Sequence, residues 1–240
     1  MFFAGGDKVI EKTIIVLILI LLVFVVHSII PTYYNKYFNK NAQRKTSTKN
    51  EVMLTFDDGP DPRYTNRLLD LLKENDVKAT FFMVAENAKK NKDIVRRMIS
   101  EGHKVGLHSW QHRNAMLYSY AYTKKDFENS VKIMKAIGVD EIFYRPPWGH
   151  TNIFSNYFVN KFGLKMIFWD VMAEDWKSES VPEIIIDKLM KRVTPYSIIC
   201  LHDAGENSGG DYGAPENTIL ALKVAIPKLK SKGYKFVLPE

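Results

Sequence analysis

Two short motifs place acidic and imidazole side chains at spacings that suit metal-assisted hydrolysis. In TFDDGP, the adjacent carboxylates Asp57 and Asp58 stand at the end of an apolar run. Because successive side chains of an extended backbone point in different directions, one carboxylate can bind a metal while the other polarises a water molecule. In HSWQH, His108 and His112 have the i, i+4 spacing that brings both imidazoles to one face of a turn or helix. Two histidines and one carboxylate, with coordination positions left open, are typical of a hydrolytic metal site.

Three further motifs, in chain order, could complete such a site. RPPWG begins with Arg145, which stands between an apolar stretch and a rigid Pro-Pro turn. This arginine could pair with an active-site carboxylate. WDVMAEDW adds Asp170 and a later acid between two indoles, and IICLHD delivers His202 at the end of an apolar stretch. Ser109 is a candidate to orient one of the imidazoles. Taken alone, each motif also fits a plainer interpretation, such as a solvated turn, unrelated histidines or a polar strand end at Asp170.

The segments around these motifs alternate between short apolar runs and longer amphipathic runs. Such alternation predicts a parallel sheet, either open or closed into a barrel. In folds of this kind the chemistry gathers at the carboxyl ends of the strands, where the reactive residues of all five motifs are expected. The expected strands are 52–56, 79–84, 104–107, 142–145, 165–169, 197–201 and 234–238, and the expected helices are 64–75, 92–101, 124–137, 153–162, 182–193 and 216–231.

Composition and charge restrict the class of protein. The chain has 240 residues, 46% of them apolar and 25% charged, which is ordinary globular usage and fits one catalytic domain. The net charge of +7 is uneven, since residues 1–50 hold seven Lys or Arg and two Asp or Glu. The remainder is nearly neutral, so no basic groove and no nucleic-acid partner are expected. The single cysteine, Cys200, excludes a disulfide framework and any multi-cysteine metal site.

The N-terminal part of the sequence contains a candidate membrane anchor. Residues 13–30 carry no formal charge, follow a short tail at 1–12, and as a helix would be roughly 27 Å long, close to a ~30 Å hydrocarbon core. An uncleaved transmembrane helix is expected, and a buried core helix or a cleaved signal peptide are the alternatives. The basic residues after the run favour a cytoplasmic domain, but long domains translocate largely regardless of charge. Residues 31–49 are expected to form a juxtamembrane linker, flexible over 39–50, before the domain at 50–240.

Taken in order, TFDDGP, HSWQH, RPPWG, the DW of WDVMAEDW and CLHD resemble the five motifs of the polysaccharide deacetylase family, the NodB-homology group of carbohydrate esterase family 4. The resemblance covers residues 50–240. It implies an α/β fold, a distorted (β/α) barrel of about seven parallel strands, here preceded by one N-terminal transmembrane helix. It also implies metal-dependent removal of N-acetyl groups from amino sugars, with one divalent ion. Zn²⁺ is expected, with Co²⁺, Ni²⁺, Mn²⁺ or Fe²⁺ as alternatives.

The resemblance further implies roles for individual residues. Asp57 would be the general base that takes a proton from the attacking water, and Arg145 would hold it ionised. His202 would be the general acid that protonates the leaving amine, and Asp175 would pair with it and raise its pKa. The implied metal ligands are Asp58, His108 and His112.

Other residues are expected to contact the substrate. The backbone N–H of Trp148 would help to hold the oxyanion, with Pro147 and Gly149 beside it, and Trp176 would wall the acetyl pocket. Cys200 stands where the family usually has a leucine, and Met172 where an Asp or Asn is common. Both departures are expected to reshape the substrate site rather than change the reaction.

Together these features predict a membrane-anchored, monomeric hydrolase acting on an N-acetylated cell-envelope glycan, peptidoglycan or a similar GlcNAc polymer. The domain would lie on the extracytoplasmic side of the cell membrane. The alternatives are a catalytically weak glycan-binding protein on the same scaffold, and a deacetylase of a lipid-linked sugar or another non-polymer amide. The Gly-rich segment 205–215 is expected to be a mobile substrate rim. His103 is expected to be structural and His150 to be a solvated loop residue.

Overall fold

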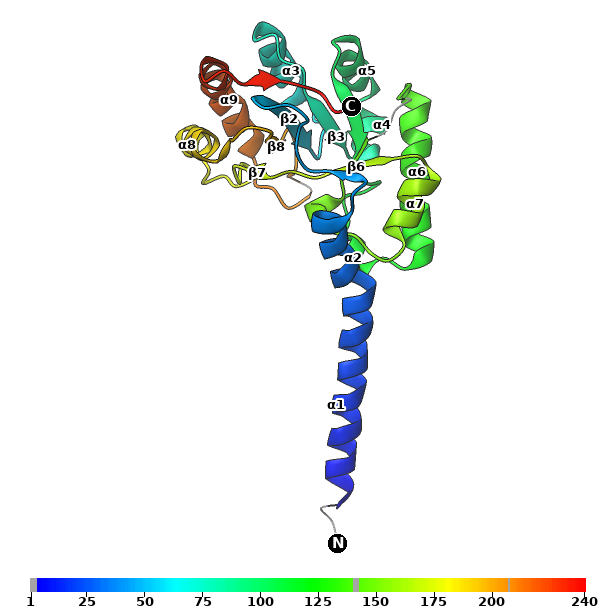
Figure 1. Cartoon of the computed structure of the whole chain (residues 1–240). Coiled ribbons are helices and arrows are strands. Elements are labelled where there is room, and N and C mark those ends of the chain that lie inside the picture. The colour runs from blue at the N-terminus through cyan, green and yellow to red at the C-terminus, as the bar shows by residue number, and fades with distance from the viewer. Residues whose placement is uncertain (1–3, 140–142, 207) are drawn as a thin grey trace.

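A parallel sheet with helices packed around it forms the domain, and a long helix extends away from one end of it (Figure 1). The computed structural model describes residues 4–139, 143–206 and 208–240. Within these residues the strand order is β1-β6-β5-β4-β3-β2-β8-β7, each neighbouring pair is parallel, and β9 pairs with the start of β2. The strands are β1 Ala42–Gln43, β2 Glu51–Asp57, β3 Thr80–Met83, β4 Lys104–Leu107, β5 Phe143–Tyr144, β6 Lys165–Ile167, β7 Val171–Met172, β8 Ile198–His202 and β9 Lys235–Phe236.

Nine α-helices accompany these strands in the described part of the chain. They are α1 Ala4–Phe24, α2 Ile30–Tyr33, α3 Thr65–Glu74, α4 Ala85–Lys90, α5 Lys92–Ser100, α6 Tyr120–Ile137, α7 Ser155–Lys161, α8 Pro182–Arg192 and α9 Ala214–Ser231. Two π-helices, η1 Val25–Ile29 and η2 Tyr34–Phe38, and two 3₁₀ turns, η3 Ala115–Leu117 and η4 Pro147–Gly149, complete the set. The expected strand–helix alternation is confirmed. The first residue of the expected strand 142–145 lies outside the described residues.

One continuous segment of chain links the two sides of the sheet. β6 pairs with β5 on one side of the domain, and three residues later β7 pairs with β8 on the other side. Asp170, between the two, accepts a hydrogen bond from the Ile198 backbone N–H at 2.7 Å and forms an ion pair with Lys45. The expected strand 165–169 is therefore shorter, since β6 ends at Ile167 and a second short strand, β7, follows at 171–172. The resulting distorted barrel follows the expected fold class.

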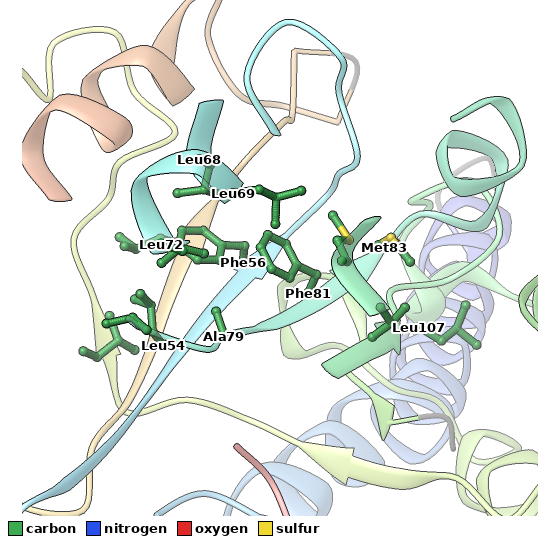
Figure 2. Packing of buried hydrophobic residues seen from close by; sticks show 14 of the residues in the cluster. Leu54, Phe56, Leu68, Leu69, Leu72, Ala79, Phe81, Met83 and Leu107 are labelled. Atoms are coloured by element: carbon green, nitrogen blue, oxygen red, sulfur yellow. The ribbon is translucent and has the colours of Figure 1, made fainter. Parts of the chain in front are cut away.

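Burial of one face of each helix explains why the amphipathic segments fold onto this sheet. In α3, the spacing of Leu68, Leu69 and Leu72 places the three side chains on one helical face, and all are fully buried. Figure 2 shows them packed over Phe56 and Phe81 of the central strands β2 and β3. The two phenyl rings stack with centroids 5.2 Å apart. This core fixes β2, whose last residue carries the first motif into the site.

The long N-terminal helix does not end where the apolar run ends. It continues through η1, α2 and η2, and its buried positions there are polar: Ser28, Thr32 and Asn35, at the i, i+4, i+7 spacing of one face. Thr32 Oγ1 donates to the Thr151 backbone oxygen at 2.9 Å, and Asn35 Nδ2 donates to Thr151 Oγ1 at 3.0 Å. A polar face on this helix therefore binds the domain.

The expectation of a flexible linker over 39–50 is wrong. Ala42 and Gln43 form β1 on the edge of β6, and the Thr46 N–H donates to the Tyr196 backbone oxygen at 2.9 Å. Arg44 donates to the backbone oxygens of Asn35 and Lys36, and so satisfies carbonyls at the end of the helix. Composition alone indicated a loop, because a two-residue strand and a guanidinium cap leave no periodic signal.

Residues Lys8–Phe38 form a helical segment long and apolar enough to cross a membrane. It is the one such segment found among the described residues, and only 6% of its most apolar window is buried by the rest of the chain. A secretory signal sequence meets the same criterion of length and composition.

Candidate active site

Asp58, His108 and His112 converge on one small space at the carboxyl end of the sheet. Nε2 of His112 lies 3.0 Å and Nε2 of His108 lies 3.5 Å from Oδ1 of Asp58. Within the described residues, this buried carboxylate oxygen has no hydrogen-bond partner of good geometry. Two imidazole nitrogens and an otherwise unsatisfied carboxylate oxygen fit a divalent ion such as zinc, with positions left for water and substrate.

Local backbone geometry holds two of these ligands in uncommon conformations. Asp58 has φ 78° and His112 has φ 52°, both in the left-handed region that L-residues rarely adopt. Asn87 Nδ2 donates to the Asp58 backbone oxygen at 3.0 Å, and the His112 N–H donates to Ser109 Oγ at 2.8 Å. Such strain persists only where surrounding contacts over-determine it, and it gathers at functional sites.

HSWQH forms a turning loop and not a helix, and the two imidazoles lie side by side as expected, with ring centroids 5.1 Å apart. β4 ends at Leu107, and positive φ values at Ser109 and His112 turn the chain back. Ser109 shapes this loop through the His112 N–H instead of orienting an imidazole. The group that orients an imidazole is the backbone oxygen of Arg145, which lies 2.7 Å from Nδ1 of His108. Because this carbonyl accepts a hydrogen bond from Nδ1–H, the proton stays on Nδ1 and Nε2 is free to bind a metal.

Electrostatics favour the metal-ready protonation states. Burial and the neighbouring His112 lower the pKa of His108 to about 3, so its ring is neutral at physiological pH. Burial opposes ionisation of Asp58, but the adjacent His112 and the charge of His202 outweigh burial and lower the Asp58 pKa. A neutral imidazole and an ionised carboxylate are the forms that bind metals.

Asp57, the last residue of β2, is held by Arg145. The guanidinium of Arg145 is fully buried and donates from one nitrogen to Asp57 Oδ1 at 2.8 Å and to Thr55 Oγ1 at 2.7 Å. It also stacks over the Phe82 ring, 4.1 Å from the centroid. The expected pairing of Arg145 with Asp57 is present.

Beside Asp57 on the neighbouring strand β8, His202 pairs with Asp175. Nδ1 of His202 lies 2.9 Å from Asp175 Oδ1, and the His202 N–H and Thr218 Oγ1 donate to Oδ2 of the same carboxylate. Burial lowers the pKa of His202, but the charge and hydrogen bond of Asp175 outweigh burial and raise it to about 9. His202 is therefore an imidazolium at neutral pH, as a general acid requires.

These groups surround a cavity of about 150 Å³. The edge of Trp176 meets the His202 ring with centroids 5.4 Å apart, and Trp148 meets His112 at 4.4 Å. The cavity is lined by Asp57, Asp58, His108, His112, Trp148, Trp169, Met172, Trp176, Cys200, His202 and residues 208–210. Part of the Gly-rich segment thus borders the cavity.

Three expected residues lie elsewhere. Pro147 and Gly149 flank Trp148 but do not line the catalytic cavity, and Gly149 instead faces the Trp169 and Phe168 rings. Asp170, a possible active-site acid by sequence, binds the start of β8 at the other end of the strands. Its position follows from the interruption between β6 and β7, which turns the carboxylate toward the Ile198 N–H.

Cys200 lies at the base of the cavity and is fully buried. Its Sγ donates a weak hydrogen bond to Asp57 Oδ2 at 3.3 Å. Burial and the nearby charge of Asp57 raise the pKa of Cys200 well above its ordinary value, so the thiol stays protonated. Asp57, Cys200 and His202 also form a cluster with metal-ligand spacing. However, Arg145 and Asp175 already occupy Asp57 and His202, so the metal belongs with Asp58.

Two buried acids support the motif loops and were not assigned a role from sequence. Asp203 accepts a hydrogen bond from Thr65 Oγ1 at 2.5 Å, and its carboxylate would lie 2.2 Å from a Cβ at Gly59, so the turn after Asp58 requires glycine. Asp126 in α6 accepts the Trp110 N–H at 3.0 Å. Asp203 could have been identified from sequence, because it follows His202 directly in the CLHD motif. Nothing in the local sequence distinguishes Asp126 from other acidic residues.

The two histidines of the domain that lie outside the motifs, His103 and His150, behave differently. His103 is buried, accepts the Ala79 N–H at 3.1 Å, and has a pKa lowered to about 4 by burial and by Lys78, which confirms a structural role. His150 is a half-buried loop residue beside Asn114. It lines a second cavity together with residues of the juxtamembrane helix.

A buried Asp-His-His set beside the Asp57–Arg145 and His202–Asp175 pairs, at the carboxyl end of a parallel sheet, is typical of a metal-dependent hydrolase. The chain belongs to the polysaccharide deacetylase family, whose sequence model matches residues 44–167. This confirms the family expected from the five motifs.

Relatives and solved structures of this family resemble the chain. Peptidoglycan-N-acetylglucosamine deacetylase PgdA of Listeria monocytogenes is 35% identical over 198 residues, which are 80% of this chain and 39% of that protein. A peptidoglycan-N-acetylglucosamine deacetylase of Bacillus cereus is 31% identical over 188 residues, covering 78% of this chain and 84% of that one. The crystal structure of the Bc1960 peptidoglycan N-acetylglucosamine deacetylase superposes with a TM-score of 0.75 at 32% identity, covering 86% of this chain and 92% of that one. The chain thus spans well under half the length of the Listeria relative.

Proposed function

We propose that this protein is a zinc-dependent, membrane-anchored and monomeric N-deacetylase of peptidoglycan or a similar GlcNAc-containing polymer. One observation carries the proposal: Asp57, paired with Arg145, and His202, paired with Asp175, are neighbours on adjacent strands and line the same cavity as the candidate metal ligands. The named activity of the relatives supports the choice of glycan.

Asp58, His108 and His112 would hold the metal. When bound, the ion would lower the pKa of a water molecule and polarise the acetyl carbonyl. Asp57, kept charged by Arg145, takes a proton from the attacking water. His202, as an imidazolium, gives a proton to the departing nitrogen while the carbon–nitrogen bond breaks. Water adds, the amide is cleaved, and acetate and a free amino sugar result.

Acetate release by the full chain in detergent, loaded with Zn²⁺, tests the reaction on a panel of peptidoglycan, chitooligosaccharides and lipid-linked amino sugars. We expect release from peptidoglycan that is lost in Asp57→Asn. Binding of glycan without acetate release from any substrate would instead support the catalytically weak glycan-binding alternative.

We further propose that residues 13–30 span the cell membrane and that the domain lies outside the cytoplasm. The exposed apolar helix supports the span, and a cell-wall substrate supports the orientation. Protease added to intact protoplasts should digest the domain. Complete protection would place the domain in the cytoplasm and contradict a wall substrate.

One observation favours a lipid-linked amino sugar as a second candidate substrate. A separate cavity of about 140 Å³ lies between the juxtamembrane helix and the catalytic site, and Trp148 lines both. Its other walls include Tyr33, Lys36 and Tyr37 of the helix. A substrate that extends past Trp148 would meet aromatic rings and an ammonium group at the membrane side, and the lipid-linked arm of the panel tests this.

A further inference from the structure

Two hydrogen bonds fix the position of the domain along its N-terminal helix. The Ile153 N–H donates to the His27 backbone oxygen at 2.9 Å, and Ser28 Oγ donates to the Met116 backbone oxygen at 2.6 Å. His27 and Ser28 belong to the apolar run 13–30, not to a segment beyond it. The domain loops that carry Met116 and Ile153 therefore lie beside the last turn of the proposed membrane span.

Large apolar side chains are exposed on these same loops. Leu117 is 78% exposed, Tyr120 49% and Ile153 47%. The ring of Tyr120 packs on Phe154 with centroids 5.3 Å apart, and Phe154 packs on His27 at 5.7 Å. The three exposed side chains, here called the membrane-facing patch, thus continue the apolar surface of the helix onto the domain.

The neighbouring helix surface indicates what covers the patch. Val26 and Ile30, on either side of the domain contact, are 56% and 55% exposed. If the helix spans a bilayer, these two side chains lie in lipid at its boundary, and the membrane-facing patch at the same level must meet lipid too. Tyrosine is favoured at this depth, because its ring is apolar while its hydroxyl reaches the headgroups.

We propose, on the basis of the membrane anchor inferred above, that the catalytic domain lies on the bilayer with Leu117, Tyr120 and Ile153 inserted into the lipid interface. The N-terminal helix runs directly into the domain and is bonded to it (Figure 1). The packed helix therefore holds the domain against the membrane, and no flexible tether separates them. Ser28 and Lys36 are eight residues apart, so the helix rises only about 12 Å between the patch and the wall of the second cavity. The catalytic cavity then opens close to the membrane surface, and the enzyme acts on N-acetyl sugars found there.

Depth-dependent fluorescence quenching of the full chain in phosphatidylethanolamine/phosphatidylglycerol nanodiscs tests the proposal. A nitrobenzoxadiazole probe is attached to Leu117→Cys, with Leu19→Cys in the middle of the span and Val224→Cys on α9 as comparisons, all three positions being exposed. Native Cys200 is buried, and labelling of the unsubstituted chain measures its background. Circular dichroism and metal content confirm that each variant is folded.

We expect lipids spin-labelled near the headgroup to quench the probe at position 117 several-fold more than the probe at 224. Quenching at position 19 by lipids spin-labelled deep in the acyl chain, without quenching at 117 by lipids labelled near the headgroup, would overturn the membrane-facing patch while leaving the anchor intact. No quenching at 19 would overturn the anchor and the patch together. Acetate release measured on the same nanodiscs is independent of both results, so failure of the reaction is distinguished from failure of the patch. Ile153→Cys serves as the second reporter if Leu117→Cys does not fold.

Discussion

Arg145 donates a hydrogen bond to Asp57 Oδ1 at 2.8 Å, and both side chains are almost completely buried. A buried carboxylate without a partner would bind a proton, and a protonated acid cannot act as a base. The guanidinium supplies the compensating charge. It also donates hydrogen bonds to Thr55 Oγ1 and to the Ile167 backbone oxygen, which hold it in place. Removing either partner would leave the other charge buried and unpaired, which is strongly destabilising.

The role of Asp57 is tested by Asp57→Asn, which keeps the shape of the side chain but cannot accept the proton of the attacking water. We expect turnover to fall by roughly 10²–10⁴-fold, the usual cost of losing a positioned proton-transfer group. Metal content should be unchanged, because Asp58, His108 and His112 are intact. Acetate release and atomic absorption measure the two quantities.

Asp61→Asn is the matched control for this variant. Asp61 lies in the same turn but pairs with Arg63 and does not line the catalytic cavity, so turnover should stay near that of the unsubstituted protein. An equal fall in both variants, or loss of metal from Asp57→Asn, would contradict a general-base role.

The metal site is tested by His112→Ala. We expect the affinity for Zn²⁺ to fall by more than the roughly 10–100-fold that loss of an outer-shell partner costs, with activity falling in parallel. Calorimetric titration of the metal-free protein measures the affinity. His150→Ala, which removes a half-buried imidazole bonded to Asn114, should bind the ion normally. A fully loaded His112→Ala protein would show that the ligand set is assigned wrongly.

Much of this site could be predicted from sequence because its residues sit at strand ends. Asp57 ends β2 and His202 ends β8, and the register pairs these two residues directly, so patterns of short apolar runs already brought the motifs to one edge. The assignment of the metal ligands and of the two ion pairs comes from the resemblance of these motifs to the family. The backbone oxygen of Arg145 that orients His108 could not be predicted, because a carbonyl carries no sequence signal.

The errors in the sequence-based expectations arise where long-range contacts override local patterns. The segment 39–50 is polar and has no period, yet Arg44 and a two-residue strand order it. The polar spacing of Ser28, Thr32 and Asn35 was a usable signal that this helix face meets protein. Asp170 stands at the end of an apolar run, but a break of three residues between β6 and β7 carries it away from the site.

The pH dependence of stability is expected to depend on Asp126. Burial, opposed by the Trp110 N–H, raises the pKa of Asp126 to about 7, from about 3.9 when unfolded. A raised acid pKa means that the folded state binds the extra proton, so this contribution to stability is complete below pH ~3.9 and is lost as the pH rises through about 7.

Asp126→Asn keeps an oxygen for the Trp110 N–H and removes the titration. We expect the free energy of unfolding of the variant, minus that of the unsubstituted protein, to be larger at pH 8 than at pH 5. Urea unfolding at both pH values measures this difference. Asp93→Asn, which changes a 96% exposed carboxylate, should shift stability equally at the two pH values. The same difference between Asp126→Asn and the unsubstituted chain at both pH values would show that Asp126 does not titrate in this range.

The general acid is tested by the alkaline limb of the pH–activity profile. His202 must be protonated to donate, and its pKa of about 9 predicts that activity is lost as the pH rises through about 9. Asp175→Asn removes the buried negative charge that favours the imidazolium, while the burial that opposes it persists. The alkaline limb should therefore move to lower pH by roughly 1–3 units. Thr218→Val, which removes one hydrogen bond to Asp175 and leaves its charge, should move the limb far less. An alkaline limb that stays in place in Asp175→Asn would remove His202 from the general-acid role and leave the hydrolase assignment to the metal site and Asp57.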